Sequence, residues 1–189
     1  MKFFVETKGA SINGAAGMVG NLLAESNLKM SNLERSSSPV PSNQKYTNSQ
    51  GGNGIAQWTG SRRTKFEQAI IGDIRYTVEN RNDYETAIRN KGLEAQLEYL
   101  WNELKSNYKP SYKAIKSTTI DSSQASTDIV ADFERPAHYL DWKYKKRRMN
   151  KGISEAKAQK DWNTTKNKRA QLAADSKITY ESSLTPGKG

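Results

Sequence analysis

The sequence predicts an α+β fold that is predominantly α, with one small β element. Apolar residues recur at helical spacing in four separate segments, which predicts four main helices. Only residues 54–59 (GIAQWT) form a short β-prone run. Residues 29–53 between the first helix and this run are rich in Ser, Asn, Pro and Gly, and we expect a long loop there.

The first helix follows Ser11, a residue suited to cap a helix N-terminus, and carries Glu25 in its last turn. Its apolar positions share the helix with a set of small residues. These are Gly14, Ala15, Ala16, Gly17 and Gly20. Small side chains let two backbones approach, so we expect this helix to pack closely against another element.

The other three helices have weaker boundary signals. Gly60 ends the β-prone run, and Ser61 is placed to cap a helix that reaches Ile70. A long apolar stripe predicts a helix over residues 85–106. Ser126 is expected to open the last one, which continues to Tyr144.

Several classes of catalytic site are excluded by composition. The chain has no cysteine, so disulfides, thiolate zinc sites and cysteine nucleophiles are impossible. The single histidine, His138, would have to serve alone in any zinc site or Ser-His-Asp triad, and we expect it to be structural or to lie on the surface. The catalytic groups that remain available are carboxylates, hydroxyls and amides, and we expect no cofactor and no metal.

Positive charge is concentrated near the C-terminal end. Residues 1–142 carry 17 Lys/Arg and 16 Asp/Glu, whereas residues 143–170 carry 11 basic and 2 acidic residues. Such a segment attracts polyanions, which can be nucleic acid, anionic lipid or the anionic polymers of a bacterial wall, or it only aids solubility. The sparse aromatic residues, among them Trp162, make nucleic acid the weaker of these.

Three motifs identify a resemblance to a known family. They are residues 20–28 (GNLLAESNL), residues 51–63 (GGNGIAQWTGSRR) and residues 133–137 (FERPA). Together they resemble the lysozyme domain of bacteriophage tail proteins, a relative of goose-type lysozymes and lytic transglycosylases. The resemblance runs from about Gly14 to Arg148, and residues 96–104 (QLEYLWNEL) look like the central helix of that family. It implies a lysozyme-like fold with the β element beside an active-site cleft.

The resemblance identifies Glu25 as the catalytic acid, and local chemistry agrees. Cleavage of a glycosidic bond needs a carboxylic acid that is still protonated near neutral pH, whereas the pKa of a free Glu is about 4.3. Apolar neighbours such as Leu22 and Leu28 disfavour the charged form, and the negative end of the helix dipole acts in the same direction. We therefore expect a raised pKa for Glu25.

The same resemblance suggests residues that contact substrate. Six are candidates for this role: Ser26, Gln57, Trp58, Thr59, Arg62 and Tyr139. Packing in the core is the alternative for Trp58, and capping or solubilising the helix is the alternative for Arg62 and its neighbour Arg63. Glu34 and Glu134 are candidates for a second acid or for the cleft wall, with a structural ion pair as the alternative for Glu134.

No second catalytic carboxylate is evident, since Glu34, Asp73 and Asp83 only lie in predicted loops. Hydrolysis as a muramidase and lytic transglycosylation on the same bond both stay open, as does a non-catalytic wall-binding or tail module. We expect residues 1–148 to be the catalytic domain and residues 149–189 a basic helical extension and linker.

The resemblance also suggests partners and location. The implied partners are bacterial peptidoglycan, other phage tail proteins and, through residues 143–170, anionic wall polymers. We expect a virion tail location for wall penetration during infection. The apolar run at the start is too short for a signal peptide, and no stretch has the length of a membrane span.

Overall fold

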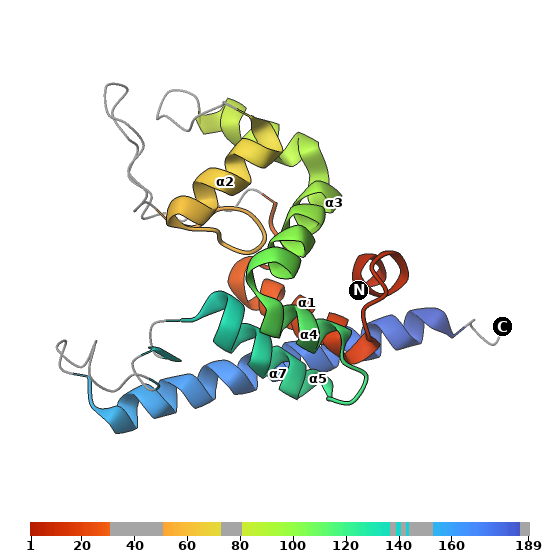
Figure 1. The fold of residues 1–189 in the computed structure, drawn as a ribbon, viewed down its shortest axis with the longest axis vertical. Coiled ribbons are helices and arrows are strands. Elements are labelled where there is room, and N and C mark those ends of the chain that lie inside the picture. Colours follow the sequence, from red (N-terminus) through yellow and green to blue (C-terminus); the bar gives the residue numbers. More distant parts are fainter. Residues whose placement is uncertain (31–50, 73–80, 137–138, 141–142, 144–152, 186–189) are drawn as a thin grey trace. The chain divides into compact units, whose positions relative to one another are not determined.

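The computed structural model describes residues 1–30, 51–72, 81–136, 139–140, 143 and 153–185, and these are largely helical (Figure 1). The chain forms two compact units. The first contains Met1–Ala24 and Leu104–Gly189, and the second contains Glu25–Glu103. The prediction of a predominantly helical protein is confirmed.

The predicted β element is reduced to a single bridge. Among the described residues, β pairing is confined to the isolated bridge between Asn53 and Trp58, and no strand forms. The reason lies in residues 54–57, which turn the chain instead of extending it: Gly54 has φ 72° and Gln57 has φ 46°. The small β element is therefore not confirmed.

The first unit is built from helices that come from both ends of the chain. Its elements are η1 (Phe3–Thr7), most of α1 (Ile12–Ser26), α4 (Lys109–Lys116), α5 (Ser122–Ile129), η2 (Val130–Glu134) and α7 (Glu155–Leu184). Ser11 caps α1 as predicted, because the Gly14 N–H donates to Ser11 Oγ at 2.9 Å.

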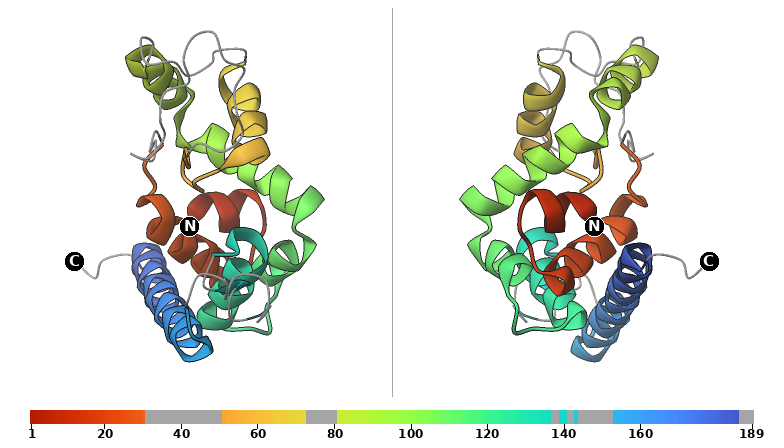
Figure 2. Two further views of the ribbon diagram at one scale, coloured as in Figure 1. Left: turned by 90° about the vertical axis from the view of Figure 1, so that its left-hand side faces the viewer. Right: turned by 90° about the vertical axis from the view of Figure 1, so that its right-hand side faces the viewer.

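The glycines of α1 bring other backbones into direct contact with it. A Cβ at Gly14 would lie 2.1 Å from the Ile115 carbonyl oxygen, one at Gly17 2.7 Å from the Ser126 nitrogen, and one at Gly20 2.6 Å from the Ala173 nitrogen. These neighbours belong to α4, α5 and α7, which lie around α1 (Figures 1 and 2). The predicted close packing of α1 is confirmed, and its partners are identified.

The basic segment contributes a helix to this core. α7 buries one face, formed by Ala158, Trp162, Arg169, Ala173, Ser176 and Tyr180. These positions keep helical spacing, but most of them are small or polar, so apolar periodicity did not show that the helical extension expected over residues 149–189 has a buried face. Trp162 packs against Tyr139 with ring centroids 4.6 Å apart and is 3% exposed, so its ring is unavailable to stack on a nucleic acid base.

The second unit contains α2 (Gly60–Ile71) and the greater part of α3 (Arg81–Asn107), which is broken at Gly92. Several predicted boundaries were wrong. Thr59 rather than Ser61 precedes α2, and α3 begins four residues before residue 85, so Asp83 lies in its first turn and not in a loop.

The last predicted helix also begins earlier than expected. α5 starts at Ser122, because Asp121 accepts the Gln124 N–H at 2.8 Å and caps the helix before Ser126. Its continuation η2 ends at Glu134, where Arg135 takes a left-handed conformation (φ 47°, ψ 56°) ahead of Pro136. Glu134 therefore lies at a helix end rather than in mid-helix, and Tyr144 lies outside the described residues.

Candidate active site

The end of α1 places Glu25 directly before an unusual turn. Glu25 is partly buried, and Ser26 is the last residue of the helix. Asn27 and Leu28 follow with φ 53° and 58°, a left-handed conformation that is uncommon for residues other than glycine and particularly for leucine. Such strain persists only where surrounding contacts impose it, and it concentrates at functional sites.

Ser26 supplies one of these contacts. Its hydroxyl donates to the Ile55 carbonyl oxygen at 2.7 Å, and the side chain is buried. This bond ties the end of α1 to the segment formed by residues 51–59. Ser26 thus holds the chain next to Glu25, and in this conformation its hydroxyl hydrogen is engaged inside the protein.

Gln96 of α3 supplies a second contact. Its Oε1 accepts the Ile55 N–H at 3.1 Å, and its Nε2 donates to the Met30 carbonyl at 2.8 Å. Gln96 is 0% exposed. Both backbone polar groups of Ile55 are therefore bonded to side chains, as buried peptide groups outside regular structure require.

The segment 51–59 is a tight turn closed by two backbone bonds. Asn53 N donates to Trp58 O at 3.1 Å, and Trp58 N donates to Asn53 O at 2.9 Å. At the turn, a Cβ on Gly54 would lie 2.8 to 2.9 Å from side-chain atoms of Trp58, Gln96 and Phe66, so only glycine fits. The turn is therefore shaped by close packing as well as by hydrogen bonds.

Trp58 lies in the core. Its indole is 0% exposed, stacks on Phe66 with centroids 4.0 Å apart, and donates through Nε1 to Glu103 Oε2 at 2.8 Å. No part of the ring is open to a sugar in this conformation, which matches the core-packing alternative. Arg62 binds the same carboxylate, with Nε to Oε1 at 2.8 Å and Nη2 to Oε2 at 2.9 Å.

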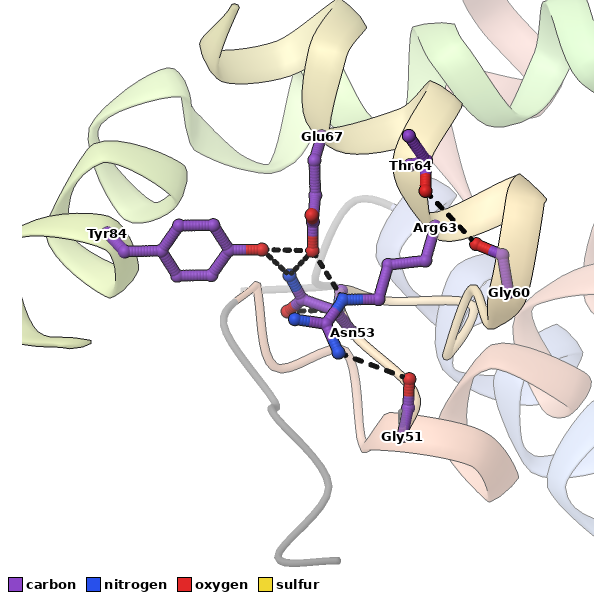
Figure 3. A network of polar contacts seen from close by, with 8 residues as sticks. Gly51, Asn53, Gly60, Arg63, Thr64, Glu67 and Tyr84 are labelled. Carbon is purple, nitrogen blue, oxygen red and sulfur yellow. Dashed lines mark hydrogen bonds and ion pairs between the residues drawn. The ribbon is translucent and has the colours of Figure 1, made fainter. Parts of the chain in front are cut away.

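A second buried network holds the start of the turn (Figure 3). Glu67 Oε1 accepts from Arg63 Nε at 2.5 Å, from Asn53 Nδ2 at 3.1 Å and from the Tyr84 hydroxyl. Arg63 also donates to the Gly51 carbonyl at 3.3 Å. The network joins the turn, α2 and α3, so Arg63 serves the interior of the protein.

Two candidate substrate contacts remain accessible. Gln57 is partly exposed and donates through Nε2 to the Gly54 carbonyl at 3.1 Å, whereas Thr59 is exposed and precedes α2 without a side-chain cap bond. Substrate contact by Gln57 and Thr59 stays a prediction.

The other candidate residues lie in the first unit or outside the described residues. Glu134 in the first unit pairs with Arg169 at 3.1 Å, and both side chains are buried, which matches the structural ion pair considered for Glu134. Tyr139, also in the first unit, is 6% exposed and forms an apolar cluster with Val130 and Trp162. Glu34, Asp73 and His138 lie outside the described residues.

Comparison with known proteins identifies the family of the chain. A family model described as phage tail lysozyme matches residues 1–164 of the 189. The chain belongs to the phage tail lysozyme family. Neither the search of curated proteins nor the search of solved structures finds a match.

Membership of the phage tail lysozyme family implies a peptidoglycan-degrading activity and fits a location in a phage tail. In the described part of the chain, no helix is both long and apolar enough to cross a membrane. Within the same residues, no group of three or more His, Asp or Glu is placed to hold a metal ion.

Sequence reasoning missed the partners that hold the turn. Gln96, Tyr99 and Glu103 lie at positions i, i+3 and i+7 of α3, so they share one helix face. Gln96 binds Ile55, Tyr99 packs edge-on against Trp58, and Glu103 binds the Trp58 indole. The signal available in the sequence was that two polar residues, Gln96 and Glu103, share one helix face with Leu100.

Proposed function

We propose that this phage tail lysozyme is a muramidase-type glycosidase and that Glu25 is its general acid. The observation that carries the proposal is the position of Glu25 at the end of α1, before a left-handed turn that Ser26 and Gln96 tie to residues 51–59. General acid catalysis needs such fixed placement, because displacement by about 1 Å can cost about a hundredfold in rate. The family match supplies the substrate class.

In the proposed reaction Glu25 donates its proton to the glycosidic oxygen as the bond to the sugar C1 breaks. The resulting carboxylate then accepts a proton from water as the water oxygen attacks C1, which restores the acid and leaves a reducing end. If the muramyl 6-hydroxyl attacks instead, the same proton transfers yield a 1,6-anhydro end. Water as the nucleophile defines the muramidase that we propose.

The substrate contacts divide into two groups under this proposal. Gln57 and Thr59, which are accessible, are the residues of segment 51–59 that we expect to meet the glycan. Ser26, Trp58 and Arg62 support them from within. We propose a tail location for the protein, where it would open the host wall during infection.

The basic segment is proposed as an accessory that binds anionic wall polymers. Lys157, Lys160 and Lys168 of α7 are exposed, although Lys157 is paired with Asp161 at 3.0 Å. Nucleic acid would be an alternative polyanion. A cosedimentation assay with walls stripped of anionic polymers, compared with intact walls, tests the accessory role.

The test of the main proposal is to incubate purified peptidoglycan with the full chain and with its Glu25→Gln variant, and to analyse released fragments by mass spectrometry. We expect fragments with reducing ends from the wild type only. Anhydro ends would instead make the protein a lytic transglycosylase. Wall binding by both proteins without any release would leave a non-catalytic tail module.

A further inference from the structure

Two neighbouring arginines at the start of α2 meet two different buried carboxylates. Arg62 binds Glu103 of α3, and Arg63 binds Glu67 one turn further along α2. Successive residues of an α-helix point about 100° apart, so a consecutive pair reaches partners on different sides. The arginine pair, which the sequence left open to a substrate role, is engaged within the second unit.

Glu67 fixes the beginning of the turn. Its carboxylate holds Asn53, whose own Oδ1 accepts the Gly54 N–H at 2.8 Å (Figure 3). Tyr84 from α3 donates to the same carboxylate, and Asn53 donates to the Tyr84 oxygen at 2.9 Å. The first residues of segment 51–59 are thereby bonded to two helices.

Glu103 fixes the end of the turn. It accepts the indole N–H of Trp58 and two bonds from Arg62, so the last buried residue of the turn is joined to α3 and α2 at once. Ile55 lies between the two anchors, and its carbonyl oxygen accepts the Ser26 hydroxyl next to Glu25. The two anchors therefore lie on either side of Ile55, whose carbonyl oxygen binds Ser26, the neighbour of Glu25 in the chain.

The burial of these carboxylates argues for a role beyond stability. Glu67 is 5% exposed and Glu103 is 8% exposed. A buried ion pair is generally no more stabilising than well-packed apolar side chains, because both ions lose their hydration. Charged pairs at both ends of one short turn are better explained by the directional hydrogen bonds that they provide.

We propose that Glu67 and Glu103 are positioning residues for the peptidoglycan reaction, since they fix both ends of the turn that holds Ser26 and hence Glu25. This inference rests on the proposed function of Glu25. Neither carboxylate contacts substrate in this account. Each acts through Asn53 or Trp58 on Ile55.

The test compares Glu67→Gln and Glu103→Gln with the wild type, each as the full chain, on soluble glycan strands prepared from peptidoglycan. We expect kcat to fall by about tenfold to a hundredfold in either variant while KM changes by less than about threefold. Glu94→Gln is the matched control, because Glu94 is an exposed glutamate of α3, and it should keep the wild-type kcat. Circular dichroism and thermal melting verify that each variant is folded at the assay temperature.

Two milder variants keep the test decisive if a glutamine variant fails to fold. Tyr84→Phe removes one donor to Glu67 but keeps the ring, and Arg62→Lys keeps the charge but loses the paired bonds to Glu103. Each should lower kcat by about threefold to tenfold without a matching change in KM.

Wild-type kcat in the folded glutamine variants, or in both milder variants, would overturn the positioning role. A change in KM alone would also overturn it. These results are distinct from failure of the proposed function, in which the wild type itself releases no fragments or Glu25→Gln remains fully active.

Discussion

The two compact units differ in the contacts that hold their segments in place. In the first unit, α1 meets its neighbours through glycines, so backbone lies against backbone at Gly14, Gly17 and Gly20. In the second unit, the turn 51–59 is held by side chains that bond directly to its peptide groups. A helix satisfies its own peptide groups and only has to be packed, whereas an irregular turn needs partners for each of them.

The buried ion pairs show the same difference. Arg169 pairs with Glu134 and also donates to the Asn21 carbonyl at 3.2 Å and to Asn21 Oδ1 at 3.1 Å, so it joins helices of the first unit. Arg63 pairs with Glu67 and donates to Gly51 in the turn. We infer that charge in the first unit serves packing specificity and that charge in the second serves the placement of the turn.

The largest loss of stability is expected from Arg169→Met. This change leaves Glu134 buried without its cationic partner, which costs about 3–5 kcal/mol. Chemical denaturation measures the change. If charge in the first unit serves packing only, the kcat of the folded variant should stay within about threefold of the wild type. A loss of kcat as large as that of Glu67→Gln would contradict this difference between the units.

A second large effect is expected from Gly14→Ala. The added Cβ would lie 2.1 Å from the Ile115 carbonyl oxygen, so α1 and α4 must separate, at a cost of about 3 kcal/mol. Gly72→Ala is the control: Gly72 has φ 68° but no atom within 4 Å of an added Cβ, so only backbone strain of about 1 kcal/mol is expected. Equal melting temperatures for the two variants would contradict close packing of α1.

A moderate effect in the second unit is expected from Gln96→Leu. The change leaves the Ile55 N–H and the Met30 carbonyl without their side-chain partner, which costs about 1–3 kcal/mol. Turnover should also fall, because the turn is less well fixed. Gln68→Leu on the exposed face of α2 should change stability by less than about 0.5 kcal/mol. Unchanged stability of Gln96→Leu would show that the turn does not depend on side-chain bonds.

The smallest effect concerns the junction of α7 with η1, where Tyr180 donates to Glu6 at 3.1 Å. Burial, then the hydrogen bond to Glu6 and the negative charge of Glu6, raise the pKa of Tyr180 above 10.0. Because the pKa is higher in the folded state than in the unfolded state, neutral Tyr180 stabilises the fold below about pH 10. This contribution is lost as the pH rises above about 10 and the tyrosine ionises. Melting at about pH 8 and about pH 11 should show a larger loss for the wild type than for Tyr180→Phe, and identical losses would rule the contribution out.

The cap, the close packing and the end of α1 could be predicted from the sequence, because each depends on residues near one another in the chain. Ser11 could be identified as a helix cap because a capping side chain binds a backbone N–H only three residues further along the chain. The glycines of α1 indicated close packing because a residue without a side chain lets another backbone approach. Glu25 was placed in the last turn of α1 because the apolar helical spacing ends at Leu23 and the loop-like composition begins at residue 29, and the helix does end at Ser26.

The contacts that surround Glu25 could not be predicted in this way. Ser26 meets Ile55 across 29 residues and Gln96 meets Met30 across 66, and no local pattern specifies such pairs. The arginine pair was left open between substrate contact and capping or solubilising the helix, because no local pattern identifies Glu103, 41 residues further along the chain, as the partner of Arg62. α7 was underestimated because its buried face is largely made of small and polar residues.

The central claim is that Glu25 is the general acid, and the most direct measurement is the rate of glycan cleavage by Glu25→Gln under conditions where it binds peptidoglycan as well as the wild type does. Glutamine keeps the shape of the side chain but has no proton to donate, so we predict a rate reduced by about a hundredfold to ten-thousandfold, with an unchanged melting temperature. Cleavage by the folded variant at the wild-type rate would contradict the account.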